Sequence, residues 1–452
     1  MSNDVTNMGS VPKSALQSPV SLRRQIVAAV MGNALEVYDF VTYAYFAVYI
    51  GQTFFPSENA TASLLASLAT FGAGFVTRPV GAFFIGRVAD TVGRRPALLL
   101  SFTLMGVANL ALALAPSYAQ IGVAASVLIV FLRMLQGFAI GGEIGPSAAF
   151  LLEVAPPGKR GLFVSFHFVG SALATLVAGL VAMGLASIFD QQGLTDYGWR
   201  LAILLGASII PIGLFLRRNL QETLGEEVPE ELDRLPDGSA QRRYFRPAII
   251  GVLMLAAGST LYYVSSYMAT YAIVVLQLPA TIAFTGTAIG GLVGLVLNPV
   301  GGWLSDHVGR KPVMIFGWTC LLVLAIPAFW LILEFRTPEM FLAMKFLMSI
   351  CAGIAGTPVL VWILEALPKH VRAGGMAMVY AFANMIFGGT TQFNIALLTE
   401  ILGNPLVPAY YLMVAIVVGV SAMAAVPETA PAVLQSRGAL GRRRHLVSER
   451  RR

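Results

Sequence analysis

Long apolar segments dominate the alternation of hydrophobic and polar positions along the chain. Charged positions, prolines and glycine clusters separate them, and most are close to the roughly 20 residues that a helix needs to cross a bilayer. This pattern predicts an all-α membrane protein with twelve transmembrane helices. The twelve spans are expected near residues 25–50, 61–88, 97–115, 121–150, 161–189, 199–216, 247–276, 281–304, 312–333, 339–365, 372–400 and 408–427.

A polar segment divides the twelve spans into two sets of six. Residues 217–246 are mixed in charge and contain proline and glycine, which is typical of a linker. We therefore expect six-helix bundles at 23–216 and 247–427, joined by this cytoplasmic linker. Residues 1–22 would form a polar N-terminal tail, because the first apolar run is too long for the core of a signal peptide. Residues 428–452 would form a basic cytoplasmic tail.

The composition fits a chain that lies mostly in lipid. It is 57% hydrophobic and 12% charged, with a mean hydropathy of +0.75, which is too little charge for a water-soluble surface. If the spans alternate, Lys and Arg gather in the loops on one side, and the opposite loops contain only Arg336. The positive-inside rule then places both termini in the cytoplasm. We expect a monomer in the inner membrane, with the lipid bilayer and no nucleic acid as a partner.

The sequence offers no chemistry for a reaction. Cys320 and Cys351 fall in apolar runs, with no sign of a disulfide or a metal site. No nucleophile–base set is recognisable, and the G-x-x-x-x-G-K-[ST] loop of ATP-binding proteins is missing. We therefore expect neither an enzyme nor a cofactor. Sodium coupling stays open, because its oxygen ligands leave no signature.

The two halves of the chain repeat three landmarks in the same order. The segment GRVADTVGRRP, around Asp90, recurs as GWLSDHVGRKP, around Asp306. The segment LEVAPPGKRG, with Glu153, resembles LEALPKHVRAG, with Glu365, and LQET after span 6 is echoed by VPET after span 12. Three ordered matches indicate a duplicated six-span unit.

These motifs also carry a family resemblance. The pattern G-x-x-x-D-x-x-G-R-[RK], present twice, resembles the signature of the major facilitator superfamily, although Thr91 and His307 stand where that family usually has Lys or Arg. The segment RMLQG, which begins at Arg133, is similar to the family's span-4 motif. More narrowly, GNALEVYDF, GAGFVTRPVGAFFIG, LQGFAIGGEIG and YGWRLAILLG resemble the metabolite–proton symporters. The segment ILEALPKHVRAGGMAMVYAFANMIFGG is most similar to their citrate and tricarballylate members.

The resemblance implies two six-helix bundles around a central cavity near the midplane. It implies proton-coupled symport of a small organic acid, either citrate or another tricarboxylate or a dicarboxylate, by alternating access. The expected partners are therefore a small organic anion and a proton. Two alternatives remain: a proton symporter of a zwitterion such as betaine or proline, and a non-transporting sensor with the same fold.

Carboxylates inside the first span are the first candidates for proton coupling. Helical spacing places Asn33, Glu36, Asp39 and Tyr43 on one stripe, and a charge near mid-membrane needs a partner or water. Repulsion between Glu36 and Asp39 favours proton uptake by one of them. The alternative is that this pair forms a structural bridge to Arg133 or to another helix and does not titrate. Arg133 would tune the proton site in either case.

Cationic and polar side chains are the candidates for substrate contact. Arg78 lies 12 residues before Asp90, roughly 18 Å along a helix, and its guanidinium suits a carboxylate of the substrate or of the protein. His167 is either a packing residue or a titratable contact. Lys345 is given no role, because it could snorkel outward. The full set of expected substrate-binding residues is Arg78, Arg133, His167, Tyr38, Tyr267, Asn384 and Gln392.

Charged residues at the cytoplasmic ends of the spans are expected to form a gate. Their ion pairs would favour one access state and break in the other, although a plain role in folding or orientation is also possible. The expected gate residues are Asp90, Arg94, Arg95, Glu153, Arg160, Asp306, Arg310, Lys311, Glu365 and Arg372.

Overall fold

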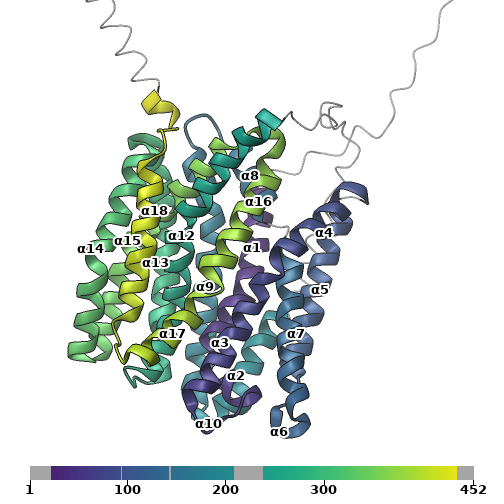
Figure 1. Ribbon diagram of the computed structural model, residues 1–452, viewed down its shortest axis with the longest axis vertical. Coiled ribbons are helices and arrows are strands. Elements are labelled where there is room, and N and C mark those ends of the chain that lie inside the picture. Colours follow the sequence, from purple (N-terminus) through teal and green to yellow (C-terminus); the bar gives the residue numbers. More distant parts are fainter. Residues whose placement is uncertain (1–21, 93, 142–143, 208–237, 435–452) are drawn as a thin grey trace, which may run out of the picture.

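A computed structural model describes residues 22–92, 94–141, 144–207 and 238–434 (Figure 1). In these ranges the chain is helical, with connecting turns and loops. The expected N-terminal tail, most of the linker and most of the basic tail lie outside the described residues. The domain boundaries therefore remain predictions.

The first half forms helices that are broken where the sequence interrupts regular hydrogen bonding. The expected second span is two helices that meet at Thr77, directly before Arg78 and Pro79. The first span likewise breaks at Phe46. The helices of this half are α1 (Leu22–Tyr45), α2 (Ala47–Phe54), α3 (Ala60–Val76), α4 (Arg78–Thr91), α5 (Arg94–Leu114), α6 (Tyr118–Ile121), α7 (Val123–Ile140), α8 (Ile144–Glu153), α9 (Arg160–Ile188), α10 (Gln191–Gly193) and η2 (Leu194–Gly198).

The second half repeats this arrangement with longer helices. Four of them, α12, α13, α14 and α15, contain an internal proline and still continue, which neighbouring helices tolerate in a bundle. The helices of this half are α12 (Gly238–Val274), α13 (Ala280–Val308), α14 (Arg310–Phe335), α15 (Pro338–Ala366), η4 (Lys369–Val371), α16 (Arg372–Ala383), η5 (Asn384–Gly388), α17 (Thr391–Leu402) and α18 (Val407–Ala424).

Eight helical stretches of the described chain are long and apolar enough to cross a membrane. The other four expected spans do not meet this criterion of length and apolar character, each for a different reason. The first carries two carboxylates, the third has a shorter apolar part at Leu99–Leu114, the sixth runs beyond residue 207, and the eleventh is divided by the π-helical turn η5. The order of helices agrees with the twelve expected spans.

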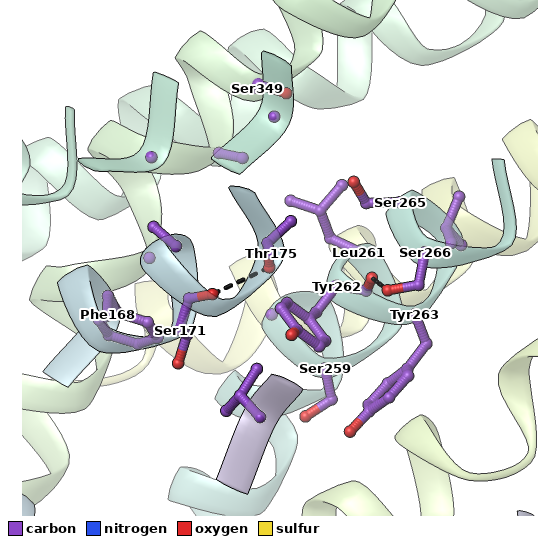
Figure 2. A pocket seen from close by; sticks show the side chains of 18 of the residues that line it. Phe168, Ser171, Thr175, Ser259, Leu261, Tyr262, Tyr263, Ser265, Ser266 and Ser349 are labelled. Atoms are coloured by element: carbon purple, nitrogen blue, oxygen red, sulfur yellow. Dashed lines mark hydrogen bonds between the residues drawn. The ribbon is translucent and has the colours of Figure 1, made fainter. Parts of the chain in front are cut away.

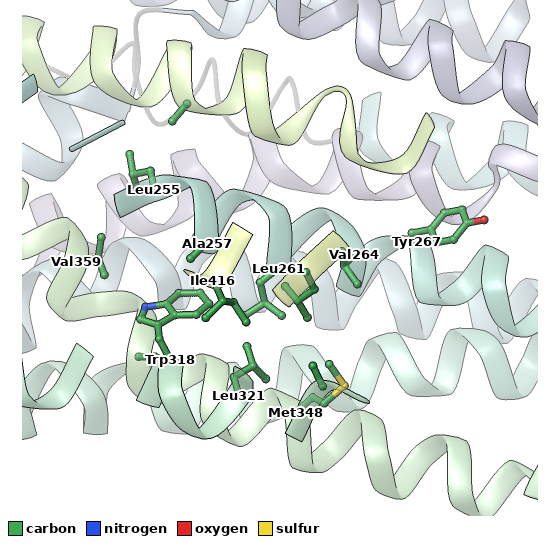
Figure 3. Close-up of a cluster of buried hydrophobic side chains, with 14 of the residues drawn as sticks. Leu255, Ala257, Leu261, Val264, Tyr267, Trp318, Leu321, Met348, Val359 and Ile416 are labelled. Carbon is green, nitrogen blue, oxygen red and sulfur yellow. The ribbon is translucent and has the colours of Figure 1, made fainter. Parts of the chain in front are cut away.

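The two halves meet along α9 and α13, which pack closely because small residues face each other. A Cβ added at Gly291 would come within 2.4 Å of the backbone N of Leu176, and one at Gly179 within 2.7 Å of that of Ala288. Close backbone approach through glycine is a common way to join helices in lipid. Away from this seam, the second half has its own apolar core between α12, α14, α15 and α18, around Trp318 (Figure 3).

The tightest helix contact gives the first prediction. A Cβ at Gly137 of α7 would lie 1.6 Å from the carbonyl oxygen of Gly74 in α3, whereas one at Gly184 of α9 would meet nothing within 4 Å. We expect Gly137→Ala to force α3 and α7 apart and to cost about 1–3 kcal/mol or more. Gly184→Ala should change stability by less than about 1 kcal/mol. Melting curves of the two purified variants test this, and equal melting temperatures would contradict it.

Candidate functional site

A cavity of about 230 Å³ lies between the halves, lined by residues of α1, α4, α8, α9, α12, α13, α14, α15, α16 and η5. It is smaller than the roughly 300–1,000 Å³ of sites for drug-sized ligands, so it suits a small metabolite. Figure 2 shows hydroxyl groups of α9 and α12 facing each other across it. Its charged and polar lining consists of Asn33, Glu36, Tyr45, Arg78, Ser171, Thr175, Ser259, Tyr262, Tyr263, Ser265, Ser266, Thr287, Asn298, Lys345, Ser349, Tyr380 and Asn384.

Arg78 reaches this cavity from the start of α4. It is only 6% exposed, and its guanidinium carbon lies 4.3 Å from the ring centre of Phe40 and 4.1 Å from that of Phe75. Tyr263 of the second half packs edge-on against Phe75, with ring centres 5.2 Å apart. The Nε atom of Arg78 is buried and has no hydrogen-bond partner among the described residues. The aromatic rings therefore hold the arginine in place while leaving donor capacity for an anion.

Asp39 and Arg133 are joined by two amide side chains. Asn109 of α5 donates to the Asp39 carboxylate and accepts a hydrogen bond from Gln136. Gln136 in turn accepts from Nη1 of Arg133 at 2.6 Å. Arg133 also lies over the ring of Tyr43, 4.3 Å from its centre, and is fully buried. The direct ion pair that the sequence left open is thus replaced by a polar chain within the first half.

The expected stripe on the first span divides between two environments. Asn33 and Glu36 line the cavity, and Asn33 donates to the backbone oxygen of His167 at 2.7 Å. Asp39 and Tyr43 are buried against other helices of the first half. The single stripe was therefore wrong, because residues spaced by three drift about 60° per step around a helix of 3.6 residues per turn. Asn33 and Asp39 consequently point about 120° apart.

Arg133, His167 and Tyr38 are expected substrate contacts that lie outside the cavity lining. Arg133 is enclosed as described above. His167 is 3% exposed, and its Nδ1 finds no hydrogen-bond partner among the described residues. Tyr38 is 2% exposed and donates to the backbone oxygen of Ala202 at 3.0 Å. Each of these side chains points into helix packing in this structure.

The second half shows a similar division. Tyr267 belongs to the apolar core drawn in Figure 3, and Gln392 donates to the backbone oxygen of Tyr263 at 3.3 Å. Neither lines the cavity. Asn384 does line it, at the first residue of the π-helical turn η5. Such turns are rare and often mark functional sites.

Lys345 differs from the sequence expectation. It does not snorkel outward: the side chain is 4% exposed, lines the cavity, and donates to the backbone oxygen of Ser265 at 2.7 Å and to its hydroxyl. The inward direction arises because this face of α15 meets α12 and α13: Lys345 bonds Ser265 of α12, and its Cε lies 3.7 Å from a Cβ built on Gly290 of α13.

Three of the expected gate contacts cross between the halves at one end of the bundle, which we call the Arg310 end. Asp306 accepts hydrogen bonds from the backbone N–H groups of Gly161 and Leu162, at 2.8 and 3.0 Å, and so caps the start of α9. A carboxylate is favoured there by the free N–H groups and the helix dipole. Two ion pairs also cross between the halves, Arg372–Glu153 at 3.0 Å and Arg160–Glu365 at 3.7 Å.

The remaining gate residues lie within the second half or are not described. Arg310 is fully buried and pairs with Asp306 at 2.6 Å and Glu365 at 3.3 Å. Glu428, from the repeated VPET segment, accepts from the backbone N–H groups of Arg310 and Lys311 at 2.9 and 3.0 Å. It therefore caps α14. The side chains of the other three expected gate residues lie outside the described part of the chain: Asp90, Arg94 and Arg95.

Sequence reasoning missed four residues that the structure brings into these networks. Gln136 stood in the quoted RMLQG segment and Glu428 in the repeated VPET segment, so both could have been found as polar positions within recurring motifs. Asn109 is a lone amide in an apolar run, and its cost in lipid was a usable signal. Lys345 was noticed but oriented wrongly. Among the described residues no group of three His, Cys, Asp or Glu could hold a metal.

Comparison with known proteins decides the family. The profile of the Major Facilitator Superfamily matches residues 29–334 and 285–451. The chain belongs to this superfamily. It is 33% identical to a citrate-proton symporter of Salmonella typhi, over 91% of this chain and 96% of the relative. It is also 33% identical to the alpha-ketoglutarate permease of Escherichia coli, over 84% and 88% of the two chains.

Other relatives and a solved structure widen the comparison. A proline/betaine transporter of Escherichia coli is 32% identical, over 90% of this chain and 84% of its own. The solved xylose transporter XylE of Escherichia coli superposes with a TM-score of 0.72 at 17% identity, covering 90% of this chain and 98% of that one. The major facilitator fold, with twelve helices in two bundles, is therefore shown. The protein is a multi-pass membrane transporter and not an enzyme.

The second prediction follows from the different burial of the gate contacts, because a buried contact contributes more than an exposed one. Asp306 and Arg310 have side chains 2% and 0% exposed, whereas Glu153 is 50% exposed. Asp306→Asn should destabilise closure of the Arg310 end by about 1.5–3 kcal/mol, because it removes the charged acceptor that caps α9 across the halves and leaves Arg310 with Glu365 alone. Glu153→Gln should cost at most about 1 kcal/mol.

The measurement is labelling of a cysteine placed at Ser259, in the cavity, after Cys320 and Cys351 have been changed to Ser. A membrane-impermeant thiol reagent should react much faster in Asp306→Asn than in Glu153→Gln. Equal labelling rates in the two variants would show that the Asp306 cap of α9 does not hold this end closed.

Proposed function

We propose that the protein is a proton-coupled symporter of a small organic acid, working by alternating access. The observation that carries this proposal is Arg78, a fixed cation at the cavity that forms no ion pair with a carboxylate of the described residues. The ion pairs among the described residues all lie at the Arg310 end, and none includes Arg78. The relatives named as a citrate-proton symporter and an alpha-ketoglutarate permease support an organic acid as the cargo.

The setting in the cell is part of the same proposal. We place the transporter in the inner membrane as a monomer, with both termini and the Arg310 end in the cytoplasm, and without nucleic acid as a partner. The asymmetry of Lys and Arg between the two sets of loops supports this orientation.

Substrate binding would begin with the guanidinium of Arg78. An organic acid loses its hydration on entering the cavity and needs charge-assisted hydrogen bonds in return. Two N–H groups of a guanidinium match the two oxygens of one carboxylate. The rings of Phe40 and Phe75 restrict the arginine, so less side-chain freedom is lost when the acid binds. The amide of Asn384 would contribute from the opposite half.

Proton coupling is assigned to Asp39 and Glu36, with Arg133 tuning the site. Asp39 is 7% exposed and receives one hydrogen bond from a neutral amide. Protonation would remove a buried negative charge and change the hydrogen bonds of the amide side chains that link Asp39 to Arg133. Glu36 faces the cavity itself. When Glu36 is protonated, it no longer competes with the substrate anion for the positive charge of Arg78. Binding of the proton and binding of the anion would therefore favour each other.

Alternating access requires contacts on both sides of the cavity that break in turn. At the Arg310 end these are the cap by Asp306 and the ion pairs across the halves. At the opposite end Phe46 packs against Phe284, with ring centres 5.3 Å apart, and Thr61 donates to Glu400 at 3.4 Å. Rocking of one half against the other would open one set while the other stays closed.

A zwitterion is the second candidate cargo. The proline/betaine transporter is nearly as similar as the organic-acid relatives. Glu36 lines the same cavity as Arg78, and a carboxylate near a cation is the arrangement that an amino acid or betaine would need. The choice between the two classes is testable by direct binding.

The third prediction concerns the driving force. Uptake of radiolabelled citrate or 2-oxoglutarate into proteoliposomes should rise with an inward proton gradient and collapse with a protonophore. Asp39→Asn should abolish accumulation against a gradient while reducing binding less, because Asp39 lies outside the cavity lining. Asp196→Asn, an exposed carboxylate, is the matched control. Full accumulation by Asp39→Asn would exclude Asp39 as the coupling site.

The fourth prediction concerns recognition. Arg78→Ala should weaken binding of the organic acid roughly tenfold to hundredfold, since a charge-assisted contact contributes about 1.5–3 kcal/mol. Arg78→Lys should not restore binding, because a point charge cannot reproduce the guanidinium fork. Arg87→Ala, an exposed arginine on the same helix, is the control.

Isothermal titration with citrate, 2-oxoglutarate, proline and glycine betaine tests recognition and cargo class together, with melting curves as the folding control. If the parent binds only the zwitterions, the organic-acid proposal is wrong. If Arg78→Ala folds and binds the acid as tightly as the parent, Arg78 has another role.

A further inference from the structure

The second half supplies a cation, Lys345, to the same cavity. Lys345 lies seven residues after the start of α15, and its side chain is 4% exposed. Its ammonium donates to the backbone oxygen and the hydroxyl of Ser265 on α12, which is labelled in Figure 2. An ammonium has three N–H groups, so one remains for a ligand in the cavity.

The hydrogen-bond partners of Lys345 among the described residues are neutral. The ion pairs within the described ranges are confined to the Arg310 end, and Lys345 is in none of them. Two hydrogen bonds to Ser265 orient the ammonium but do not cancel its charge. A buried cation in a membrane protein is costly without a counter-ion. The arrangement therefore favours an anion that enters the cavity from outside.

Arg78 and Lys345 place two cations in one cavity. Both side chains line one cavity, yet Arg78 belongs to the first half of the chain and Lys345 to the second. We propose that Lys345 binds substrate, and that Arg78 and Lys345 hold two carboxylates of the same molecule. The proposal rests on the proposed organic-acid function and narrows its substrate class to di- and tricarboxylates.

This pairing has consequences for selectivity and for transport. A monocarboxylate would leave one cation without a partner, and a zwitterion would bring its own cation toward Lys345 or Arg78. Both are disfavoured by unpaired or like charges in a desolvated site. A polycarboxylate would also tie the two halves to each other, so binding would favour the state in which both cations face one cavity. The neutral oxygens of Ser265 orient the Lys345 ammonium and, unlike a carboxylate, do not compete with the substrate for its charge.

The test is a cycle in which one charge is removed from the protein and one from the ligand. Citrate and 2-oxoglutarate are titrated into the purified parent, and the tighter acid is compared with its analogue bearing one primary amide in place of a carboxylate. We expect the parent to bind the amide roughly tenfold to hundredfold more weakly. Lys345→Met should bind the acid weaker by a similar factor and should lose most of its preference for acid over amide.

Matched variants separate charge from folding. Lys345→Arg keeps the charge and should keep the preference, and Lys369→Met removes a lysine charge from an exposed position and should change neither affinity. Lys345→Gln, which retains donors for the Ser265 oxygens, replaces Lys345→Met if the latter melts at a lower temperature than the parent.

The outcomes distinguish this inference from the proposed function. If the parent binds the acid and Lys345→Met binds it equally tightly, or retains the full preference for acid over amide, Lys345 does not hold a carboxylate. The organic-acid function then still stands. If the parent binds glycine betaine or proline and neither acid, both proposals fall.

Discussion

A charge buried in a membrane protein must meet a partner or a polar cavity, and this constraint organises the whole molecule. Arg310 meets Asp306 and Glu365 at one end of the bundle. Arg133 meets aromatic rings and the amide of Gln136. Arg78 and Lys345 form no ion pair among the described residues, and both line the central cavity, where an anion can reach them. The charges that have partners within the protein therefore mark structural sites, and the two cations at the cavity mark the site left for cargo.

The seam between the halves combines firm and breakable contacts. Along α9 and α13, glycines allow backbone approach that no larger side chain would permit. At the Arg310 end, the cap of α9 by Asp306 joins the halves through a buried carboxylate, while the pair Arg372–Glu153 is half in solvent. Such contacts are strong when formed and are lost together when the helix end moves away. Such contacts suit a bundle in which one end closes while the other opens.

The cavity shows how a small site could select among metabolites. Aromatic rings fix Arg78 on one side, and the Ser265 oxygens orient Lys345 on the other. Fixed charges select mainly by penalising ligands that leave them unpaired. Glu36 in the same lining offers the means by which a proton would alter this balance. Selectivity and coupling would then depend on the same few charges.

The sequence by itself determined the number and order of the spans and the duplication, and it picked out charged residues that pair at the Arg310 end. These follow from segment length, repeated motifs and rise per residue, which are local properties of a chain in a bilayer. Helical spacing alone did not decide which neighbour each face meets. Only the tertiary structure separated Glu36 from Asp39, directed Tyr38 and Gln392 into helix packing, and turned Lys345 inward. A helix presents several faces, and packing against other helices decides which of them borders a cavity.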